Sequence, residues 1–304
     1  MLFLTDFKGE IAALSVAFLW AVTSVVYSRL GKKIPPVLMN LSKGGIAIAL
    51  IILTILVSGQ QLFPNISTVP FLLLLLSGAV GIGVGDTAYF SALNRLGARR
   101  TLLLKTLGPP FAAIVSAIFL KEQLSYTAWI AILLTVLGIA WVISERVNTN
   151  LAGSKEQLTH GISFALLSAF TDATGAVLSR AALTDTNISS LWSAMVRLIG
   201  GAIILLVWMQ FNRRTSDVSM KELRSGRLLG IVALCAFLST YLGFWLQQIS
   251  LKFTAAGIAK SLGATSPLFV LPLAILMGEK VSLRTLLGVL IAVMGVGLLF
   301  IYRT

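Results

Sequence analysis

Six ionisable residues lie inside long apolar stretches of this sequence, where charged groups are rare. They are Lys43, Asp86, Lys105, Asp172, Arg197 and Lys260. If these stretches cross a bilayer, each charge near its centre costs roughly 2.5–3.5 kcal/mol on insertion scales, so such residues usually serve a function. Four cations and two carboxylates form a mildly cationic set. We expect this set to bind a small anion or zwitterion, and a buried carboxylate to take up and release protons.

The three lysines have two interpretations. Lys43, Lys105 and Lys260 lie about four to seven residues from the centres of their stretches, which is roughly 6–10 Å at the helical rise. Their long side chains could therefore snorkel to the membrane surface. Alternatively they face a central cavity or act as gate charges. The matching positions of Lys105 and Lys260 in a duplicated sequence favour this second interpretation.

The two aspartates also have two interpretations. Asp86 could form a structural pair with Lys105, because their stretches are expected to be antiparallel, and Asp172 could pair with Arg197. The functional interpretation is that these carboxylates bind substrate or a coupling proton, as carboxylates in membrane proton relays do.

Further candidates occupy matching positions in the two halves of the chain. Tyr89 and Trp245 match at an offset of 156 and could line the same cavity. Pro109, Pro110 and Pro267 lie in the middle of matching apolar stretches. Proline removes a helical hydrogen bond, and matched glycine and proline interruptions are typical of transporter binding sites. A structural kink is the alternative interpretation.

The composition indicates a membrane protein with several spans. Of 304 residues, 57% are hydrophobic and 12% are charged, whereas soluble domains contain about 25% charged residues. The formal charge of +13 comes largely from basic residues between apolar runs, a pattern of membrane loops rather than of a nucleic-acid surface. One cysteine and one histidine argue against a disulfide framework and a Cys/His metal site. We expect no cofactor and no metal, and no nucleophile–base pattern suggests an enzyme.

Ten apolar runs are long enough to cross a bilayer, which needs about 20 residues. We expect them at 11–29, 36–58, 69–94, 101–120, 125–144, 161–182, 188–211, 226–249, 254–277 and 283–302. The first run lacks a cleavage site of small residues and is interpreted as a retained span rather than a signal peptide.

The sequence from Lys105 to Ile143 occurs a second time from Lys260 onward. Three pairs are identical at an offset of 157: Pro110 and Pro267, Glu122 and Glu279, and Gly138 and Gly295. Each half contains five spans, an odd number, so the second half must enter the membrane from the opposite side. The sequence therefore predicts an all-α polytopic membrane protein with ten transmembrane helices in two inverted five-helix repeats. The repeats cover 1–147 and 161–304, joined by a linker at 148–160.

The distribution of lysine and arginine predicts the orientation. Fifteen of these residues lie in the links on one side and five on the other. Because basic loops stay in the cytoplasm, both termini are expected outside, in a bacterial plasma membrane.

Two glutamates follow the fourth and ninth spans. Glu122 and Glu279 precede Ser125 and Ser282 by three residues. A carboxylate and a hydroxyl at these positions are expected to cap the next helix.

The chain resembles the EamA-type permeases of the drug/metabolite transporter superfamily. The resemblance is carried by Leu120-Lys121-Glu122 and Met277-Gly278-Glu279, each with a proline twelve residues before its glutamate, and by the run Tyr89-Phe90-Ser91-Ala92-Leu93. It implies alternating-access transport of a small metabolite through a cavity lined by spans 1–4 and 6–9, with spans 5 and 10 peripheral. Related triose-phosphate translocators bind phosphate through basic residues on the fourth and ninth spans, where Lys105 and Lys260 lie.

The leading prediction is a secondary transporter for a small anionic or zwitterionic metabolite, bound by Lys105, Lys260 and Arg197. Protons are the candidate coupling ion, through Asp86 or Asp172. The alternative is an exporter of neutral amino acids or amphipathic cationic compounds, which those carboxylates would bind. A third reading is a non-transporting structural or lipid-handling membrane protein.

Overall fold

The computed structural model describes residues 7–30, 34–62, 64–145, 155–211, 226–266, 268–269 and 282–301. Within these ranges the chain is helical and contains no strand. The elements of the first half are α2 (Lys8–Leu30), α3 (Pro36–Val57), α4 (Thr68–Gly78), η1 (Ala79–Asp86), α5 (Thr87–Lys105), α6 (Gly108–Phe119) and α7 (Tyr126–Glu145). Those of the second half are α8 (Lys155–Leu183), α9 (Ser190–Phe211), α11 (Gly226–Cys235), η3 (Ala236–Leu242), α12 (Gly243–Phe253), α13 (Ala256–Gly263) and α15 (Leu283–Ile301).

Five helical runs in the described part are long and apolar enough to cross a bilayer: Pro36–Val57, Thr68–Leu96, Glu156–Leu183, Ser190–Phe211 and Leu228–Phe253. Large apolar side chains such as Leu137 and Leu206 are exposed on the outer faces of the bundle. Such a surface suits lipid rather than water, so the expectation of an all-α polytopic membrane protein is confirmed.

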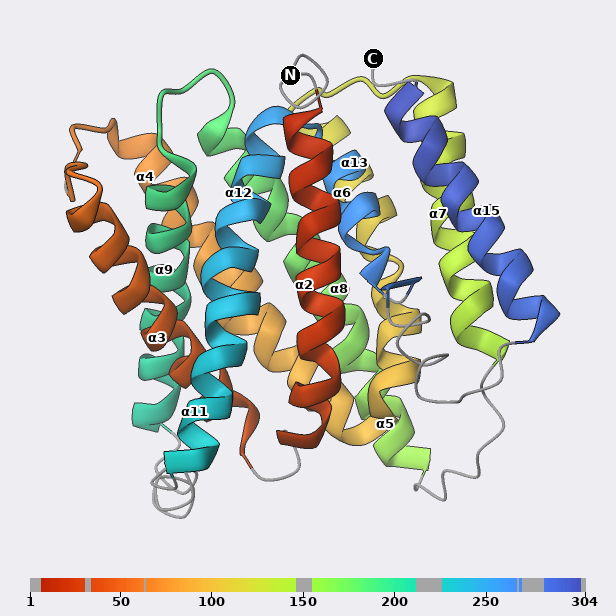
Figure 1. Cartoon of the computed structure of the whole chain (residues 1–304), viewed down its shortest axis with the longest axis horizontal. Coiled ribbons are helices and arrows are strands. Elements are labelled where there is room, and N and C mark those ends of the chain that lie inside the picture. The colour runs from red at the N-terminus through yellow and green to blue at the C-terminus, as the bar shows by residue number, and fades with distance from the viewer. Residues whose placement is uncertain are drawn as a thin grey trace.

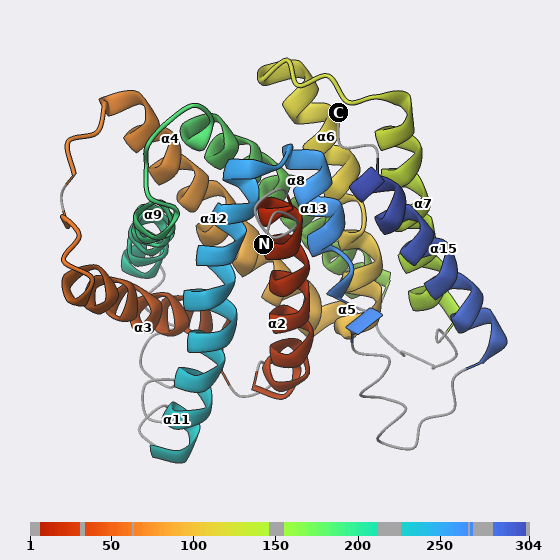
Figure 2. The same cartoon turned by 45° about the horizontal axis from the view of Figure 1, so that its top comes forward.

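The helices run side by side around α2, which lies at the centre of the view in Figure 1. Helix α12 lies on one side of α2, and α13 and α6 lie on the other (Figures 1 and 2). Helices α3, α4 and α9 form one flank, and α7 pairs with α15 at the opposite edge. Helix α2 begins and α15 ends at the same end of the bundle (Figure 1).

The paired helices α7 and α15 approach closely because small residues meet between them. A Cβ atom added at Gly138 would collide with the backbone of Ala292, and one added at Gly295 would collide with the backbone of Thr135. Lipid provides no hydrophobic drive between helices, so close backbone contact of this kind stabilises their association.

Two π-helical segments interrupt long helical runs: η1 lies between α4 and α5, and η3 lies between α11 and α12. A side chain from another helix binds a carbonyl oxygen in each of them. Asn40 donates its amide to the Ile82 carbonyl at 2.8 Å, and the Trp20 indole donates to the Ser239 carbonyl at 3.0 Å. Such segments are frequent at functional sites, and both of these face the centre of the bundle.

The structure corrects the predicted boundaries of the fourth span. The expected link at residues 95–100 is helical, because α5 continues to Lys105. The span is instead broken at Thr106 and Leu107, and Pro109 and Pro110 lie in the first turn of α6. The backbone N–H groups of the first helical turn make no intrahelical hydrogen bond, so proline removes none there. The prolines therefore begin a helix rather than kink one.

A corresponding break occurs in the predicted ninth span. Helix α13 ends at Gly263 and is followed by a turn at Ala264 and Thr265. Pro267, the third predicted helix-breaking residue, lies outside the described residues, as does Glu279.

Candidate functional site

The centre of the bundle contains a cavity of about 180 Å³. Its wall is built from both halves of the chain, and all six ionisable residues singled out in the sequence line it: Lys43, Asp86, Lys105, Asp172, Arg197 and Lys260. The other lining residues are Trp20, Thr23, Ser24, Tyr27, Gly81, Ile82, Tyr89, Phe90, Thr106, Gly108, Pro109, Ser239, Phe244, Gly263, Ala264 and Ser266.

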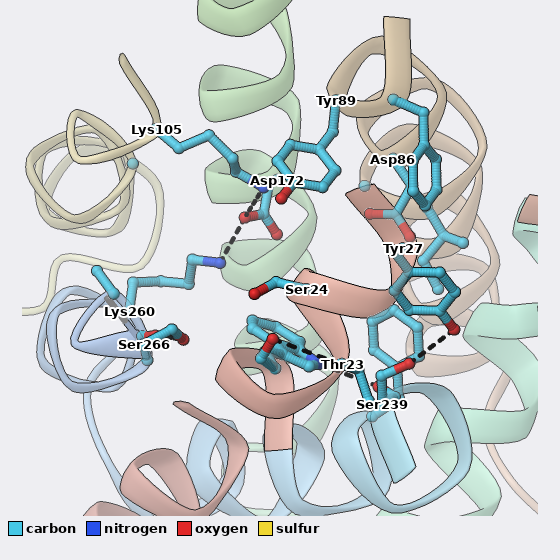
Figure 3. Close-up of a pocket in the computed structure, with 18 of the residues that line it drawn as sticks. Thr23, Ser24, Tyr27, Asp86, Tyr89, Lys105, Asp172, Ser239, Lys260 and Ser266 are labelled. Atoms are coloured by element: carbon cyan, nitrogen blue, oxygen red, sulfur yellow. Dashed lines mark hydrogen bonds and ion pairs between the residues drawn. The ribbon is translucent and has the colours of Figure 1, made fainter. Parts of the chain in front are cut away.

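Lys105, Asp172 and Lys260 form what we call the lysine cluster (Figure 3). Lys260 Nζ donates to Asp172 Oδ2 at 2.6 Å, and Lys105 Nζ lies 3.4 Å from the same oxygen. Each lysine lies in the last turn of its helix, α5 or α13, where the helix dipole favours a cation. One carboxylate is shared by two ammonium groups, so the cluster keeps one positive charge.

The ring of Tyr89 supports the less tightly held lysine of this cluster. The Lys105 ammonium lies 4.7 Å from the centroid of the Tyr89 ring, within the range of a cation–π interaction. The Lys105 side chain is also more exposed than that of Lys260, at 23% against 9%. Lys105 is therefore the member of the cluster that an incoming anion reaches with least rearrangement.

Lys43, Asp86 and Arg197 form a second group, the arginine cluster. Lys43 Nζ donates to Asp86 Oδ2 at 2.5 Å, which neutralises both groups. The ring of Phe244 contacts both cations: its centroid lies 5.8 Å from Lys43 Nζ and 5.7 Å from Arg197 Cζ. This cluster too holds two cations and one carboxylate.

Arg197 is held by amide oxygens rather than by a carboxylate. Its Nη1 donates to Gln248 Oε1 at 2.8 Å and to Gln247 Oε1 at 3.1 Å. Gln248 is fixed in turn because its amide donates to Ser193 Oγ at 3.0 Å. Amide oxygens satisfy donors but carry no net charge. The guanidinium charge is therefore not neutralised by these contacts.

The pairing suggested by the sequence was wrong for both aspartates. Asp86 pairs with Lys43 rather than with Lys105, and Asp172 pairs with Lys260 and Lys105 rather than with Arg197. The sequence shows that a charge inside an apolar helix needs a partner, but only helix rotation and packing decide which cation faces which carboxylate.

Hydroxyl groups on the cavity wall were not singled out by the sequence. Ser24 and Thr23 donate to backbone carbonyls of α2, at 2.8 Å and 2.9 Å, and Ser239 bonds to the Tyr27 hydroxyl at 3.0 Å. Serine and threonine commonly satisfy themselves on their own helix, so sequence alone does not distinguish a wall residue from a packing residue. Ser24 lies between the labelled lysines and Asp86 in the view of Figure 3.

Two predicted site residues lie away from the cavity. Tyr89 lines it, but Trp245, its partner by sequence offset, is absent from the wall and packs 6.1 Å from the ring of Tyr241. Pro109 lines the cavity, whereas its neighbour Pro110 does not.

The sequence suggested that Glu122 caps the helix that follows it, but in the structure it does not. It accepts a hydrogen bond from Arg180 Nε at 2.7 Å and from the Ala256 backbone N–H at the start of α13 at 3.3 Å. Ser125 does cap α7, by accepting from the Ala128 N–H at 3.2 Å. Glu122 instead joins the end of α6 to elements of the second half of the chain.

Among the residues that the structure describes, no group of three or more histidine, cysteine, aspartate or glutamate side chains could hold a metal ion. The chemistry of the cavity is that of charge pairs, hydroxyl groups and aromatic rings. Such a cavity can bind a small charged solute.

The chain is similar in sequence to proteins that are described as transporters. An "Uncharacterized transporter" from Archaeoglobus fulgidus is 24% identical over 291 residues, covering 95% of this chain and 96% of the relative. Another protein described as an uncharacterized transporter, from Clostridium kluyveri, is 30% identical over 108 residues, or 35% of this chain and 33% of the relative.

A solved crystal structure has the same fold. It superimposes with a TM-score of 0.78 at 18% sequence identity and covers 97% of each chain. The sequence model of the EamA-like transporter family matches twice, at residues 7–144 and 159–301. The chain is therefore a membrane transporter protein that belongs to the EamA-like transporter family.

Proposed function

We propose that the protein is a secondary transporter that moves a small anionic metabolite across a bacterial plasma membrane by alternating access. The observation that carries this proposal is the surplus of two positive charges in a cavity at the centre of the bundle. A buried charge without a counterion is unfavourable. An anionic substrate would supply that counterion.

The lysine cluster is the proposed first contact of the substrate. Lys105 and Lys260 come from the two halves of the chain and share Asp172. An entering anion would replace part of the contact that Asp172 makes with Lys105, which is the longer of the two at 3.4 Å. Asp172, once released, is the candidate site for a coupling proton.

Alternating access in an inverted repeat needs two halves related by an axis in the membrane plane. We propose ten spans in two such halves, at 1–147 and 161–304. Several observations support this. The family model matches once in each half. Segments η1 and η3 begin 157 residues apart, at Ala79 and Ala236.

The contact between α7 and α15 gives further support. Gly138 meets Ala292, and Gly295 meets Thr135. An offset of 157 converts Gly138 into Gly295 and Thr135 into Ala292, so the two contacts exchange under the repeat. When a repeat exchanges two contacts of one helix pair in this way, a twofold axis is expected to pass between the two helices.

The orientation proposed from the basic residues places both termini outside. The start of α2 and the end of α15 lie at one end of the bundle, which agrees with an even number of crossings (Figure 1). A reporter fused after Thr304 is expected to be active outside the cytoplasm, and activity confined to the cytoplasm would contradict the orientation.

The alternative of an exporter for cationic compounds is less well supported. It requires free carboxylates, but Asp86 and Asp172 are both paired with lysines. A substrate cation would have to displace an ammonium group that belongs to the protein.

The test is thermal stabilisation of the purified protein by a panel of metabolites sorted by charge, followed by flux into proteoliposomes. A ligand of the native state raises the unfolding temperature by mass action. Small anions are expected to stabilise the protein, and Lys105→Ala and Lys260→Ala are expected to remove the effect. Lys121→Ala is the control, because Lys121 is exposed and does not line the cavity.

Stabilisation only by cations or neutral amino acids, retained in both lysine variants, would overturn the anion proposal. The absence of any solute-dependent flux across the panel would point to a non-transporting role.

A further inference from the structure

The two surplus positive charges of the cavity belong to different clusters. The lysine cluster holds two cations against Asp172, whereas Asp86 is paired with Lys43, and Arg197, the third member of the arginine cluster, forms no ion pair among the described residues. The ion pair between Lys43 and Asp86 is short, so the surplus charge of the arginine cluster resides on Arg197. A single carboxylate on a substrate could satisfy one cluster and would leave the other unchanged.

Arg197 has unused capacity to bind an anion. The residue is 2% exposed, and its Nε has no hydrogen-bond partner in the described part of the chain. Its Nη1 donates to two amide oxygens, and no carboxylate of the described residues lies within ion-pair distance of Arg197. A buried donor without a partner costs about 1–3 kcal/mol, more for a charged group.

The surroundings keep this guanidinium in place beside the cavity. Helix α9 is pressed against α4 and η1, where Gly78 leaves room for the backbone of Arg197 itself. Gly81 lies next to the guanidinium, since a Cβ added there would be 3.4 Å from Arg197 Nη2. With Phe244 on another side, the charge is fixed in position and cannot move to a distant partner.

A role for Arg197 in packing alone does not explain its charge. A neutral side chain could fill the same space and bond to Gln247 and Gln248 without the cost of burying an ion. Replacing buried charges by apolar residues of similar volume is often neutral or stabilising. The charge is therefore best explained by a ligand that neutralises it.

We propose that the substrate is a small dianion with acidic groups at both ends, of which one binds the lysine cluster and the other binds Arg197. This inference rests on the proposed function and specifies its substrate class: short dicarboxylates. Ser24 also lines the cavity and is a candidate hydrogen-bond partner for such a molecule.

The size of the cavity agrees with this class. The cavity has a volume of about 180 Å³. This space is sufficient for a short, linear metabolite.

The experiment compares three probes of similar length that differ at one end: butyrate, succinate and 4-aminobutyrate. Their dissociation constants are measured by calorimetry on the purified full-length protein at neutral pH. Succinate is expected to bind about tenfold to a hundredfold more tightly than butyrate, the effect of a hydrogen-bonded charge pair, and 4-aminobutyrate is expected to bind most weakly.

The decisive variant is Gln247→Glu, which keeps an oxygen near Arg197 Nη1 but neutralises its charge. The ratio of succinate to butyrate affinity is expected to fall close to one. The matched control is Gln247→Met, which is similar in size and uncharged and should keep the preference for succinate. If Gln247→Glu does not fold, Gln248→Glu tests the same idea, because Gln248 also accepts from Nη1 at 2.8 Å.

Failure of this inference can be distinguished from failure of the proposed function. If butyrate and succinate bind equally well to the wild type, or the succinate preference survives in Gln247→Glu, the second acidic group is wrong while an anion site at the lysine cluster stands. Tighter binding of 4-aminobutyrate than of succinate would also overturn the dianion. If none of the three probes and no other anion binds, the proposed function itself fails.

Discussion

Helices α3 and α9 occupy matching places in the two halves of the chain, yet they are packed and charged differently. Gly44-Gly45 in α3 matches Gly200-Gly201 in α9 at an offset of 156. A Cβ added at Gly200 would collide with the backbone of Leu75, whereas one added at Gly44 would meet no atom of the described residues within 4 Å. Helix α9 is therefore in close backbone contact with α4, and α3 has free space at the equivalent position.

The two helices also differ in whether their buried charge is neutralised. Lys43 on α3 is neutralised by Asp86, while Arg197 on α9 donates to the amide oxygens of Gln247 and Gln248. An unneutralised charge binds a ligand best where it is held rigidly, because no reorganisation is then needed on binding. The family model matches each half of the chain once, and the asymmetry lies in the individual side chains of the two halves.

The largest effect is expected for Gly200→Ala, which tests the tight side of the comparison. The added methyl group has no space against the backbone of Leu75, so α9 and α4 must separate. Overpacking of this kind costs about 1–3 kcal/mol and occasionally more, and we expect about 3 kcal/mol because backbone rather than a side chain must move. Unfolding of the purified protein measures this loss of stability. A loss below about 0.5 kcal/mol would show that α9 and α4 are not in close backbone contact at Gly200.

A smaller effect on stability is expected for Asp86→Asn, which removes the charge compensation of α3. Lys43 then lacks its partner, and we expect a loss of about 2 kcal/mol, below the roughly 3–5 kcal/mol of a fully buried pair because the Asp86 side chain is 22% exposed.

The same substitution leaves a third surplus positive charge in the cavity. Anion affinity is therefore expected to rise by at least about tenfold, because at an effective dielectric constant of about 20 a unit charge even about 12 Å away contributes about 1.4 kcal/mol. Asp185→Asn is the control, because it makes the same charge change at an exposed position with positive φ that asparagine tolerates. Unchanged or weaker anion binding in Asp86→Asn would contradict the account of the arginine cluster.

The smallest effect is expected for Gly44→Ala, on the open side of the comparison. The added methyl group meets no atom within 4 Å, and alanine favours a helix over glycine by about 1 kcal/mol. The free energy of unfolding should stay the same or rise slightly. A loss comparable to that of Gly200→Ala would mean that α3 is as tightly packed as α9 in the protein's dominant state.

The residues of the candidate site could be found from the sequence because charge inside an apolar stretch is rare. All six ionisable residues line the cavity, as do Tyr89 and Pro109. Hydroxyl groups such as Ser24 and Ser239 give no comparable signal, because they occur equally in the packed interior of membrane helices. Trp245 was expected at the cavity from its sequence match to Tyr89, but the halves have diverged at this position.

The sequence by itself determined that the chain is an apolar helical protein with a duplicated pattern and costly charges in its spans. Apolar runs, basic links and repeated glycines and prolines are local properties that can be read in one dimension. The tertiary structure decided the charge pairs, the close contact at Gly200 and the link from Glu122 to Arg180. These depend on the rotation and crossing of helices far apart in the chain, and a shift of one residue turns a side chain by about 100° around its helix.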